Sequence, residues 1–379
     1  MSTVRQINQN DYLSVAEFLE KMTQGVFSVN QWRERFQLWW DDNPCMVASQ
    51  PMGWVLYDNE EIIRGFFGLI PGKYHYNGQD IMSYSATSWY VEKNFRQHSL
   101  KLIKPYFEQP KPCLLLDTTP APNVVKVFLH YKFKEYHPMW LGSRVIVPVD
   151  SQKLVKLFII KKKSNSRIVS LFQPLLLMCS PFLNGIQFMR QQCLKNIRHQ
   201  FQIQEINKFT SSHQNLDEFY KKYYKVVVSK DVTYLNWFFF SSEELKKSRK
   251  ILEISNSNEV LGVVIINIVR IHESGKSFVY FDVVDINLIK TDEDILLAIM
   301  KGVLALARKH HEKVAYIRLP GFDNQSKTLF SKIGIPMSLG DPAFIYRYMG
   351  DEKEEIIENC AHGLYTSPLD GDRGFFIGY

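Results

Sequence analysis

Cysteine is scarce in this sequence, and the placement of its five residues excludes two common uses. They are scattered and odd in number, at Cys45, Cys113, Cys179, Cys193 and Cys360. No pair has the short spacing of a zinc or iron–sulfur site, so no metal is expected. A disulfide framework is not indicated either, and we expect the chain in a reducing cytoplasm.

Long basic runs are also lacking, and no leader is expected from the first residues. The net charge is a modest +7, and no run of lysine and arginine is long and interleaved with aromatic residues. This pattern gives no indication of a nucleic-acid partner, whereas a small polyanion or an anionic membrane surface fits it. The N-terminal sequence MSTVRQINQNDY is polar and has no signal-peptide pattern.

Only one apolar stretch approaches the length of a membrane span. Ile168–Met189 has no charged residue, but two prolines and a glycine interrupt it. The basic stretch Lys153–Lys163 precedes it. We expect a helical linker over residues 151–200, packed between domains. The alternative is peripheral contact with the inner face of a membrane through residues 153–190, because basic residues beside an apolar segment suit an anionic interface.

Length and apolar content predict two domains with ample cores. The chain has 379 residues, of which 45% are hydrophobic. Over the first 150 residues, turn signals and periodicity predict the order β-α-α-β-β-β-α-β-α-β. The hairpin of Gly53–Tyr57 with Ile62–Ile70 is its clearest part, with a turn expected at Pro71-Gly72.

The second half repeats marks of the first. Trp40 and Gly65 recur as Trp237 and Gly262, each 197 residues later. Two unrelated marks at one offset indicate a duplication. We therefore predict an α+β fold of two tandem domains, each a mixed, mostly antiparallel sheet flanked by helices. Their expected ranges are 1–150 and 201–350, joined by the linker at 151–200 and followed by a tail at 351–379.

The stretch Ser83–Gln109 is the most informative part of the chain. A strand ends at Val91, a polar turn follows, and an amphipathic helix is expected with Leu100, Ile103 and Phe107 on one side. The first N–H groups of a helix have no internal partners and point towards any anion placed there. The residues that open this helix are Arg96, Gln97, His98, Ser99, Leu100 and Lys101.

This stretch resembles motif A of the GNAT superfamily, the acetyl-CoA-dependent N-acyltransferases. The family pattern is a strand ending near valine, then Arg/Gln-x-x-Gly-x-Gly/Ala at the start of the helix. Val91 and Arg96 match it, whereas Ser99 and Lys101 replace the two small residues. Ser99 could donate to a phosphate, and Lys101 could pair with one or block the pocket. The predicted element order agrees with the family.

The resemblance implies acetyl-CoA as co-substrate and a small-molecule amine as acceptor. In the family, backbone N–H groups near Trp89, Tyr90 and Val91 would polarise the thioester carbonyl, and Arg96–Lys101 would hold the pyrophosphate. The second half has no counterpart of that turn, so we expect the coenzyme in the first copy only.

The groups for proton transfer are less clear from the sequence. Asp117 ends the neighbouring strand and is the candidate base, with a helix N-cap as the alternative. The family's tyrosine acid is replaced by Phe128 and Phe330, so Tyr131 is the nearest candidate acid. Asp282 lies between apolar residues and is predicted to be either catalytic or paired.

The tail around Asp370-Gly371-Asp372 is expected to be solvated, with a flap over the acceptor as the alternative. It is similar to the Thr/Asp-rich tails of tandem GNAT enzymes of surface-polysaccharide biosynthesis, which implies an amino sugar or sugar nucleotide as acceptor. Two other functions stay open. One is a peptidoglycan-bridge transferase that uses aminoacyl-tRNA, and the other is a catalytically inactive coenzyme-binding scaffold.

Overall fold

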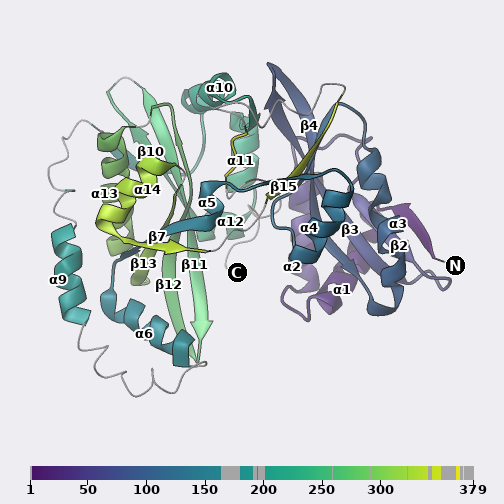
Figure 1. The fold of residues 1–379 in the computed structure, drawn as a ribbon, viewed down its shortest axis with the longest axis horizontal. Coiled ribbons are helices and arrows are strands. Elements are labelled where there is room, and N and C mark those ends of the chain that lie inside the picture. Colours follow the sequence, from purple (N-terminus) through teal and green to yellow (C-terminus); the bar gives the residue numbers. More distant parts are fainter. Residues whose placement is uncertain are drawn as a thin grey trace. The chain divides into compact units, whose positions relative to one another are not determined.

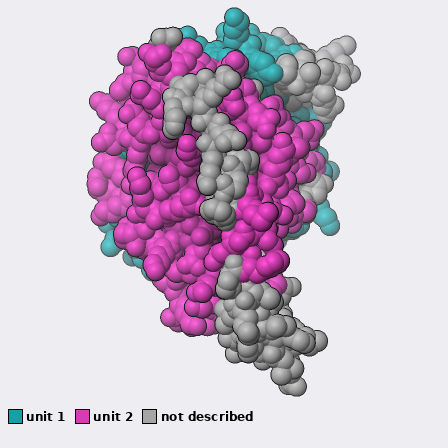
Figure 2. Space-filling model, turned by 90° about the vertical axis from the view of Figure 1, so that its left-hand side faces the viewer, with its two compact units in different colours: residues 1–136, 217–242, 343–375 teal, residues 137–216, 243–342, 376–379 magenta. Residues whose placement is uncertain are grey.

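The structure is a computed structural model (Figure 1). It describes residues 2–163, 180–190, 194, 201–257, 259–290, 292–321, 323–339, 344–350, 364–367 and 370. The chain forms two compact units, and neither is continuous in sequence. Unit 1 comprises residues 1–136, 217–242 and 343–375, and unit 2 comprises 137–216, 243–342 and 376–379 (Figure 2).

Unit 1 is built on a mixed sheet whose described strands run in the order β1-β2-β3-β4-β5-β15-β6, with β9 beside β3. Only β4 and β5 are parallel. The strands are β1 (Thr3–Gln6), β2 (Gly53–Tyr57), β3 (Ile63–Tyr76), β4 (Gln79–Val91), β5 (Cys113–Asp117), β6 (Lys134–Tyr136), β9 (Val226–Val228) and β15 (Phe344–Met349). The helices are η1 (Gln9–Asp11), α1 (Tyr12–Met22), α2 (Val29–Phe36), η2 (Gln37–Asp41), η3 (Lys93–His98), α3 (Ser99–Ile103), η4 (Lys104–Glu108), α4 (Pro122–His130), α10 (Gln214–Tyr223) and α11 (Val232–Phe240).

Unit 2 is built on a second sheet, whose described strands run in the order β14-β7-β13-β12-β11-β10-β8. Here β12 and β13 are the parallel pair. The strands are β7 (Ser143–Pro148), β8 (Gln202–Ile206), β10 (Arg249–Ser255), β11 (Val260–Glu273), β12 (Lys276–Leu288), β13 (Val314–Pro320) and β14 (Ile335–Ser338). The helices are α5 (Met139–Gly142), α6 (Ser151–Lys163), α9 (Ser180–Arg190), η6 (Ser211–His213), α12 (Glu243–Ser248), α13 (Glu293–Lys309) and α14 (Asn324–Ile333).

The two halves of the chain exchange one strand each. β7 follows the first copy in sequence but pairs between β13 and β14 in the second sheet. β15 follows the second copy but pairs between β5 and β6 in the first sheet. The sheets therefore differ from the contiguous ranges 1–150 and 201–350. Periodicity predicts a strand at each position but not its partner, since both strands are apolar enough for either core.

The duplication is clearest in the central hairpin. β3 and β11 each have 14 residues, β4 and β12 each have 13, and both pairs are offset by 197 residues. The connecting turns match as well, because Asn77-Gly78 and Ser274-Gly275 all have positive φ. This is the backbone that a two-residue hairpin turn requires. The predicted repeat of two GNAT-like folds is thus confirmed in its geometry.

Two local predictions for the first copy are wrong. Pro71-Gly72 is not a turn but lies inside β3, where Pro71 pairs with Tyr84. The carbonyl of Pro71 accepts from Asn43 on the side of β3 that faces away from β4. In a strand the N–H and the carbonyl of one residue face the same side, so the N–H that proline lacks would not have bonded to β4. The proline is therefore tolerated at this position. Pro71 lies between the part of β3 that pairs with β2 and the part that pairs with β9.

The helix expected from Leu100 is also different. The segment is a 3-10 turn, five residues of α-helix and a second 3-10 turn, so the buried face shifts. Leu100 is 51% exposed, whereas Leu102, Ile103 and Tyr106 are fully buried. A 3-10 turn holds three residues instead of 3.6, which moves each later side chain around the axis.

The described part of the tail is buried rather than solvated. Tyr365 N donates to Val226 O at 2.9 Å, and Ser367 N donates to the Asp370 carboxylate at 2.8 Å. Ser367 and Asp370 are 1% and 2% exposed. Asp372 and most of the other predicted tail residues lie outside the described residues, as does the part of the apolar run before Ser180. No helix among the described residues is long and apolar enough to cross a membrane.

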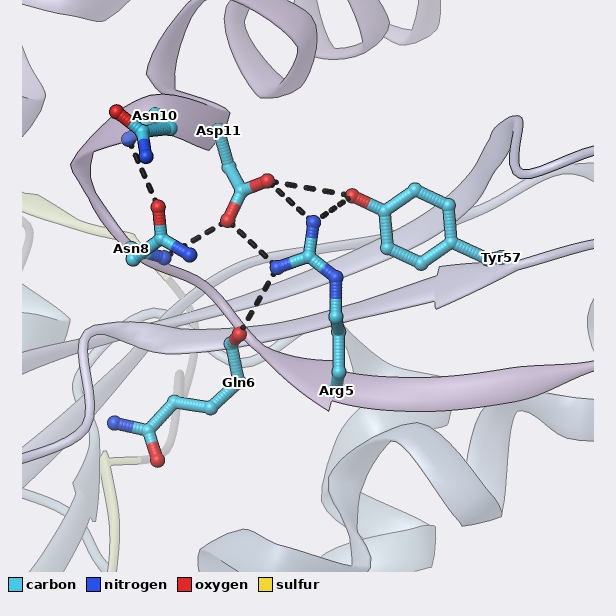
Figure 3. Close-up of polar contacts among 6 residues, drawn as sticks. All are labelled: Arg5, Gln6, Asn8, Asn10, Asp11 and Tyr57. Carbon is cyan, nitrogen blue, oxygen red and sulfur yellow. Dashed lines mark hydrogen bonds and ion pairs between the residues drawn. The ribbon is translucent and has the colours of Figure 1, made fainter.

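A polar cluster fixes the start of the first copy (Figure 3). The guanidinium of Arg5 on β1 donates two hydrogen bonds to the Asp11 carboxylate, at 2.8 and 2.5 Å, and a third to Tyr57 on β2 at 2.7 Å. Asp11 also accepts from Asn8 N at 2.9 Å, which closes a capping box around η1. Burial raises the pKa of Asp11, but the bonds from Arg5 and Asn8 outweigh it and lower the pKa overall.

Candidate functional site

The parallel strands of the first copy separate part-way along their length. β4 pairs with β5 from Met82↔Cys113 to Ser85↔Leu116, and β5 ends at the next residue, Asp117. β4 continues to Val91 in register with β3 alone. The backbone of β4 beyond Ser85 therefore presents donors and acceptors that β5 does not take up. An extended ligand could pair with such an edge as an added strand does.

Tyr106 marks the point where the strands separate. Its hydroxyl lies 3.2 Å from Tyr84 O on β4 and 3.0 Å from Leu116 O on β5, and it donates to these carbonyls. Burial, and then the charge of Asp117, raise its pKa well above the ordinary value, so it remains a donor. Tyr106 was not among the residues predicted at the site, because a helical pattern says nothing of where a hydroxyl group lies.

A bulge in β4 follows directly. Gly68 on β3 faces Thr87 and Phe66 faces Tyr90, so two residues of β4, Ser88 and Trp89, oppose one residue of β3. Ser88 has φ +53°, which is strained for a residue with a side chain. A bulge next to a strand separation re-aims backbone groups, and such bulges are frequent beside active sites.

The three strand residues predicted to meet the thioester lie at or after this bulge. Trp89 is half-buried, and its ring contacts Phe67 and Phe128, with centroids 6.1 Å apart in both cases. Val91 is buried and pairs with Gly65. Tyr90 is half-buried in the pair with Phe66. The packing of Trp89 on the core holds the backbone of this segment in place.

The turn predicted to hold the pyrophosphate follows β4 as η3 and α3. Arg96, Gln97 and Lys101 are exposed, and His98 and Ser99 are half-buried. No side chain caps either of these two described helices at its N-terminal residue. The turn thus combines basic side chains with backbone donors that no side-chain cap occupies.

A network of ion pairs anchors the entry to this turn. Glu92 accepts from Lys21 at 2.8 Å and from Arg64 at 3.1 Å, and Arg64 also donates to Asp58 at 2.7 Å. Burial raises the pKa of Glu92, but Lys21 and Arg64 lower it more. Glu92 N donates to Arg64 O at 2.9 Å, so both backbone and side chain fix its position.

The two predicted proton-transfer residues of the first copy lie at the end of β5 and at the C-terminal end of α4. Asp117 accepts from Thr119 N at 3.1 Å, and α4 begins after Ala121, so Asp117 does not cap that helix. Tyr131 follows α4, and its ring stacks on Phe107 with the centroids 4.2 Å apart. Phe128, in the family's tyrosine position, is fully buried.

Asp282 of the second copy is paired. Arg318 on the neighbouring strand donates to it through Nε at 2.7 Å and through Nη2 as well. Burial lowers the pKa of Arg318, but the hydrogen bond and charge of Asp282, with smaller contributions from Tyr280 and Tyr316, together raise it above the ordinary value. The guanidinium also lies over the ring of Tyr280, 5.2 Å from its centroid. These contacts belong to unit 2, where the strand order places Asp282 opposite Arg318.

The strand–helix junction of the second copy has the opposite charge. α13 begins after Asp292, whose carboxylate caps it by accepting from Ile295 N at 2.8 Å. Glu293 and Asp294 lie in its first turn. Carboxylates already occupy the positive end of this helix dipole, so a phosphate would be repelled there.

One group of metal-type side chains lies together among the described residues, namely His310, His311 and Glu312. Arg270 Nε contacts both carboxylate oxygens of Glu312, at 3.0 and 3.2 Å. The backbone carbonyl of Glu312 lies 3.0 Å from His310 Nδ1. The three side chains therefore lie together because Glu312 pairs with Arg270 and because the chain turns at the end of α13.

Comparison with known proteins bears on the fold. No family model and no curated protein matches the sequence. A GCN5-related N-acetyltransferase from Anabaena variabilis aligns with a TM-score of 0.53 at 10% identity, over 92% of this chain and 73% of that one. A probable N-acyltransferase from Enterococcus faecalis aligns at 0.56 and 9% identity, over 92% and 73%. Saccharomyces cerevisiae N-myristoyltransferase with bound myristoyl-CoA aligns at 0.51 and 11%, over 91% and 78%. The chain therefore has the tandem GNAT fold, as its sequence predicts.

Proposed function

We propose that this protein is an acyl-CoA-dependent N-acyltransferase that binds acetyl-CoA in its first copy and transfers the acetyl group to a small amine. The observation that carries the proposal is that three features follow one another along β4. β4 separates from β5, bulges at Ser88, and passes into an uncapped basic turn. The similar solved structures include a GCN5-related N-acetyltransferase and an N-myristoyltransferase with its acyl-CoA.

In this proposal each part of β4 has a task. The pantetheine arm pairs with the strand edge after Ser85, and the backbone near Trp89–Val91 donates to the thioester oxygen as negative charge develops there. The pyrophosphate lies on Arg96–Lys101, where Arg96 and Lys101 supply positive charge. The ion-pair network at Glu92 keeps the turn at a fixed distance from the bulge.

The chemical step needs three proton transfers. Asp117 takes a proton from the acceptor ammonium, and the amine then attacks the thioester carbonyl. The new N–C bond forms, the C–S bond breaks, and the departing thiolate takes a proton from the Tyr131 hydroxyl or from water. The nitrogen gives its second proton to the phenolate or hydroxide left behind, which yields the neutral amide. Asp117 lies one residue beyond Leu116, whose carbonyl Tyr106 binds, so its backbone position at the strand separation is well defined.

We propose an amino group on a sugar or sugar nucleotide as acceptor. The tail similarity supports this choice, together with the carboxylate at Asp117, which suits an ammonium group. Asp282 is the second candidate for binding the acceptor ammonium. In that case the hydrogen bonds from Arg318 would hold its carboxylate in position. An aminoacyl-tRNA donor and an inactive scaffold remain the competing functions.

The first experiment measures donor binding by titration calorimetry with acetyl-CoA, myristoyl-CoA and free coenzyme A. Two charge reversals give a matched pair: Lys101→Glu at the first junction and Lys290→Glu at the second. We expect Lys101→Glu to weaken acetyl-CoA binding at least ~10-fold, because it places an acid against the phosphates, and Lys290→Glu to leave it unchanged. Equal effects of the two variants would place the donor elsewhere.

The second experiment follows acetyl transfer by mass spectrometry across amino sugars, nucleotide amino sugars, peptides and polyamines. Transfer to amino sugars supports the acceptor class, and transfer confined to peptides or polyamines rejects it. Tight acetyl-CoA binding without transfer to any acceptor supports the scaffold. Binding of aminoacyl-tRNA without binding of acetyl-CoA supports the aminoacyl transferase.

A further inference from the structure

The positive charge of this protein is concentrated in one stretch. Residues 151–200 contain nine lysines and arginines and no aspartate or glutamate. The net charge of the whole chain is only +7, so all other residues together are slightly acidic. Such separation of charge along a chain is typical of a segment that meets an anionic partner.

The described parts of this stretch, α6 and α9, both belong to unit 2 and pack against each other (Figure 1). The orientation of α9 is fixed by two hydrogen bonds from its inner side. Gln187 Nε2 donates to Ile333 O and Arg190 Nη1 donates to Gly334 O, both at 2.9 Å. Gln187 is buried by this contact with the end of α14.

The other side of α9 is apolar and exposed. Phe182 and Met189 are 72% and 74% exposed, the two highest values among the large apolar side chains of the described residues. They are seven residues apart, which is two helical turns, so they lie on one face. That face is opposite Gln187, at about 100° of rotation per residue. Single exposed apolar residues are ordinary, but a helix normally turns its apolar face inward.

Two neighbouring elements of unit 2 also expose apolar and basic side chains. On α6, Phe158 is 51% exposed and Lys156 is exposed too. Side chains of α9 donate to the backbone of Ile333 and Gly334, and β14 begins at the next residue. β14 is the edge strand of the second sheet. Every residue of β14 is exposed, and the large apolar side chains on it and just after it are Ile335 at 48%, Met337 at 39% and Leu339 at 44%.

We propose that this surface of α6, α9 and β14 docks the protein on an anionic lipid bilayer. Phe182 and Met189 enter the boundary between headgroups and acyl chains, and the exposed basic side chains of the two described helices, Lys156 and Arg190, bind the headgroups. Lysine and arginine near an anionic bilayer are attracted to its headgroups, and the 151–200 stretch contains no acid that would oppose this attraction. A helix that lies in the interface needs one apolar face and basic flanks, as α9 has.

The surface is independent of the proposed acyl-CoA site, which lies in unit 1. Its test is co-sedimentation of the full chain with vesicles of phosphatidylcholine alone, and of phosphatidylcholine with about 30 mol% phosphatidylglycerol. We expect binding to the anionic vesicles, weaker binding to the neutral ones, and loss of binding in high salt.

The double variant Phe182→Glu/Met189→Glu removes both apolar side chains and adds two negative charges. We expect it to bind anionic vesicles at least ~10-fold more weakly. The matched control is Leu13→Glu/Val26→Glu in unit 1, where the side chains are 50% and 59% exposed. It makes the same chemical change and should bind as the unmodified chain does. Melting curves of both variants check that each is folded.

Three outcomes would overturn the proposal. The unmodified chain does not bind anionic vesicles at low salt. The Phe182→Glu/Met189→Glu variant binds as tightly as the control. Sedimentation velocity shows a dimer that this variant dissociates, in which case a second copy of the chain covers the surface instead of lipid.

Discussion

The two copies share a central hairpin of equal length but differ where its second strand passes into a helix. In the first copy, β4 carries a positive-φ bulge residue and leads through an anchored acid, Glu92, to an uncapped basic turn. In the second, β12 leads to α13, whose first residues are acidic and capped by Asp292. A duplicated backbone thus retains its geometry, and we propose that a few residues at one junction decide which copy can receive a polyanion.

The polar clusters at the start of each copy differ in the same way. Both have a 3-10 turn closed by a capping box, from Asn8 to Asp11 in the first and from Thr210 to His213 in the second. Asp11 pairs with Arg5, whereas His213 Nε2 lies 3.1 Å from the Glu253 carboxylate. The cap position is retained while its acid is replaced by a histidine that lies beside an acid, so the pairing serves the fold rather than one ligand.

The largest effect is expected from an acid in the first junction. Ser99→Glu places a bulky negative side chain where we propose the pyrophosphate lies, so acetyl-CoA affinity should fall at least ~100-fold. Calorimetry measures the affinity, and circular dichroism checks the fold. Lys290→Glu in the second junction is the control. Unchanged affinity in Ser99→Glu would remove the distinction between the two copies.

Asp117→Asn tests the proposed base of the first copy. The amide cannot accept the proton, so kcat should fall ~100-fold while acetyl-CoA affinity stays the same. Asp282→Asn is the informative companion, because Asp282 is bonded to Arg318 and its loss should reduce stability by about 2 kcal/mol. If Asp282→Asn lowered kcat and left stability intact, the second copy would supply the base.

The cluster of Figure 3 gives a pH-dependent prediction. The folded pKa of Asp11 is lowered, so its contribution is present at neutral pH and is lost as the pH falls below about 4. Asp11→Asn should cost about 1–2 kcal/mol at pH 7 and less at pH 3, as measured by urea unfolding. In an Arg5→Met background the cost should shrink, since the partner is gone. A cost that does not vary with pH would assign the effect to capping alone.

The smallest effects test the equivalence of the two hairpins. Gly78 has φ +82° and Gly275 has φ +73°, and a Cβ at either site would meet no atom within 4 Å. Gly78→Ala and Gly275→Ala should each destabilise by about 1 kcal/mol through backbone strain alone. Two transitions in the melting curve, each sensitive to one substitution, would show that the units unfold separately. A clear difference in cost would indicate that the turns are not equivalent.

The sequence alone determined the fold class, the duplication and the position of the turn in its central hairpin. These follow from periodicity and turn signals, which are local properties: Asn77-Gly78 specifies a tight turn wherever it occurs. The junction at Arg96–Lys101 could also be predicted, because its basic residues follow a strand directly. Its 3-10 geometry could not, since helical periodicity assumes a uniform turn.

Only the tertiary structure decided which strand pairs with which. β7 and β15 are apolar strands that either sheet would accept, and long-range pairing rather than local pattern assigns each to the opposite copy. The same holds for single side chains. Tyr106 became a bridge between β4 and β5, and Asp282 became the partner of Arg318, because residues distant in sequence meet there. A hydrogen bond depends on where both partners lie, and the pattern around one residue specifies only one of them.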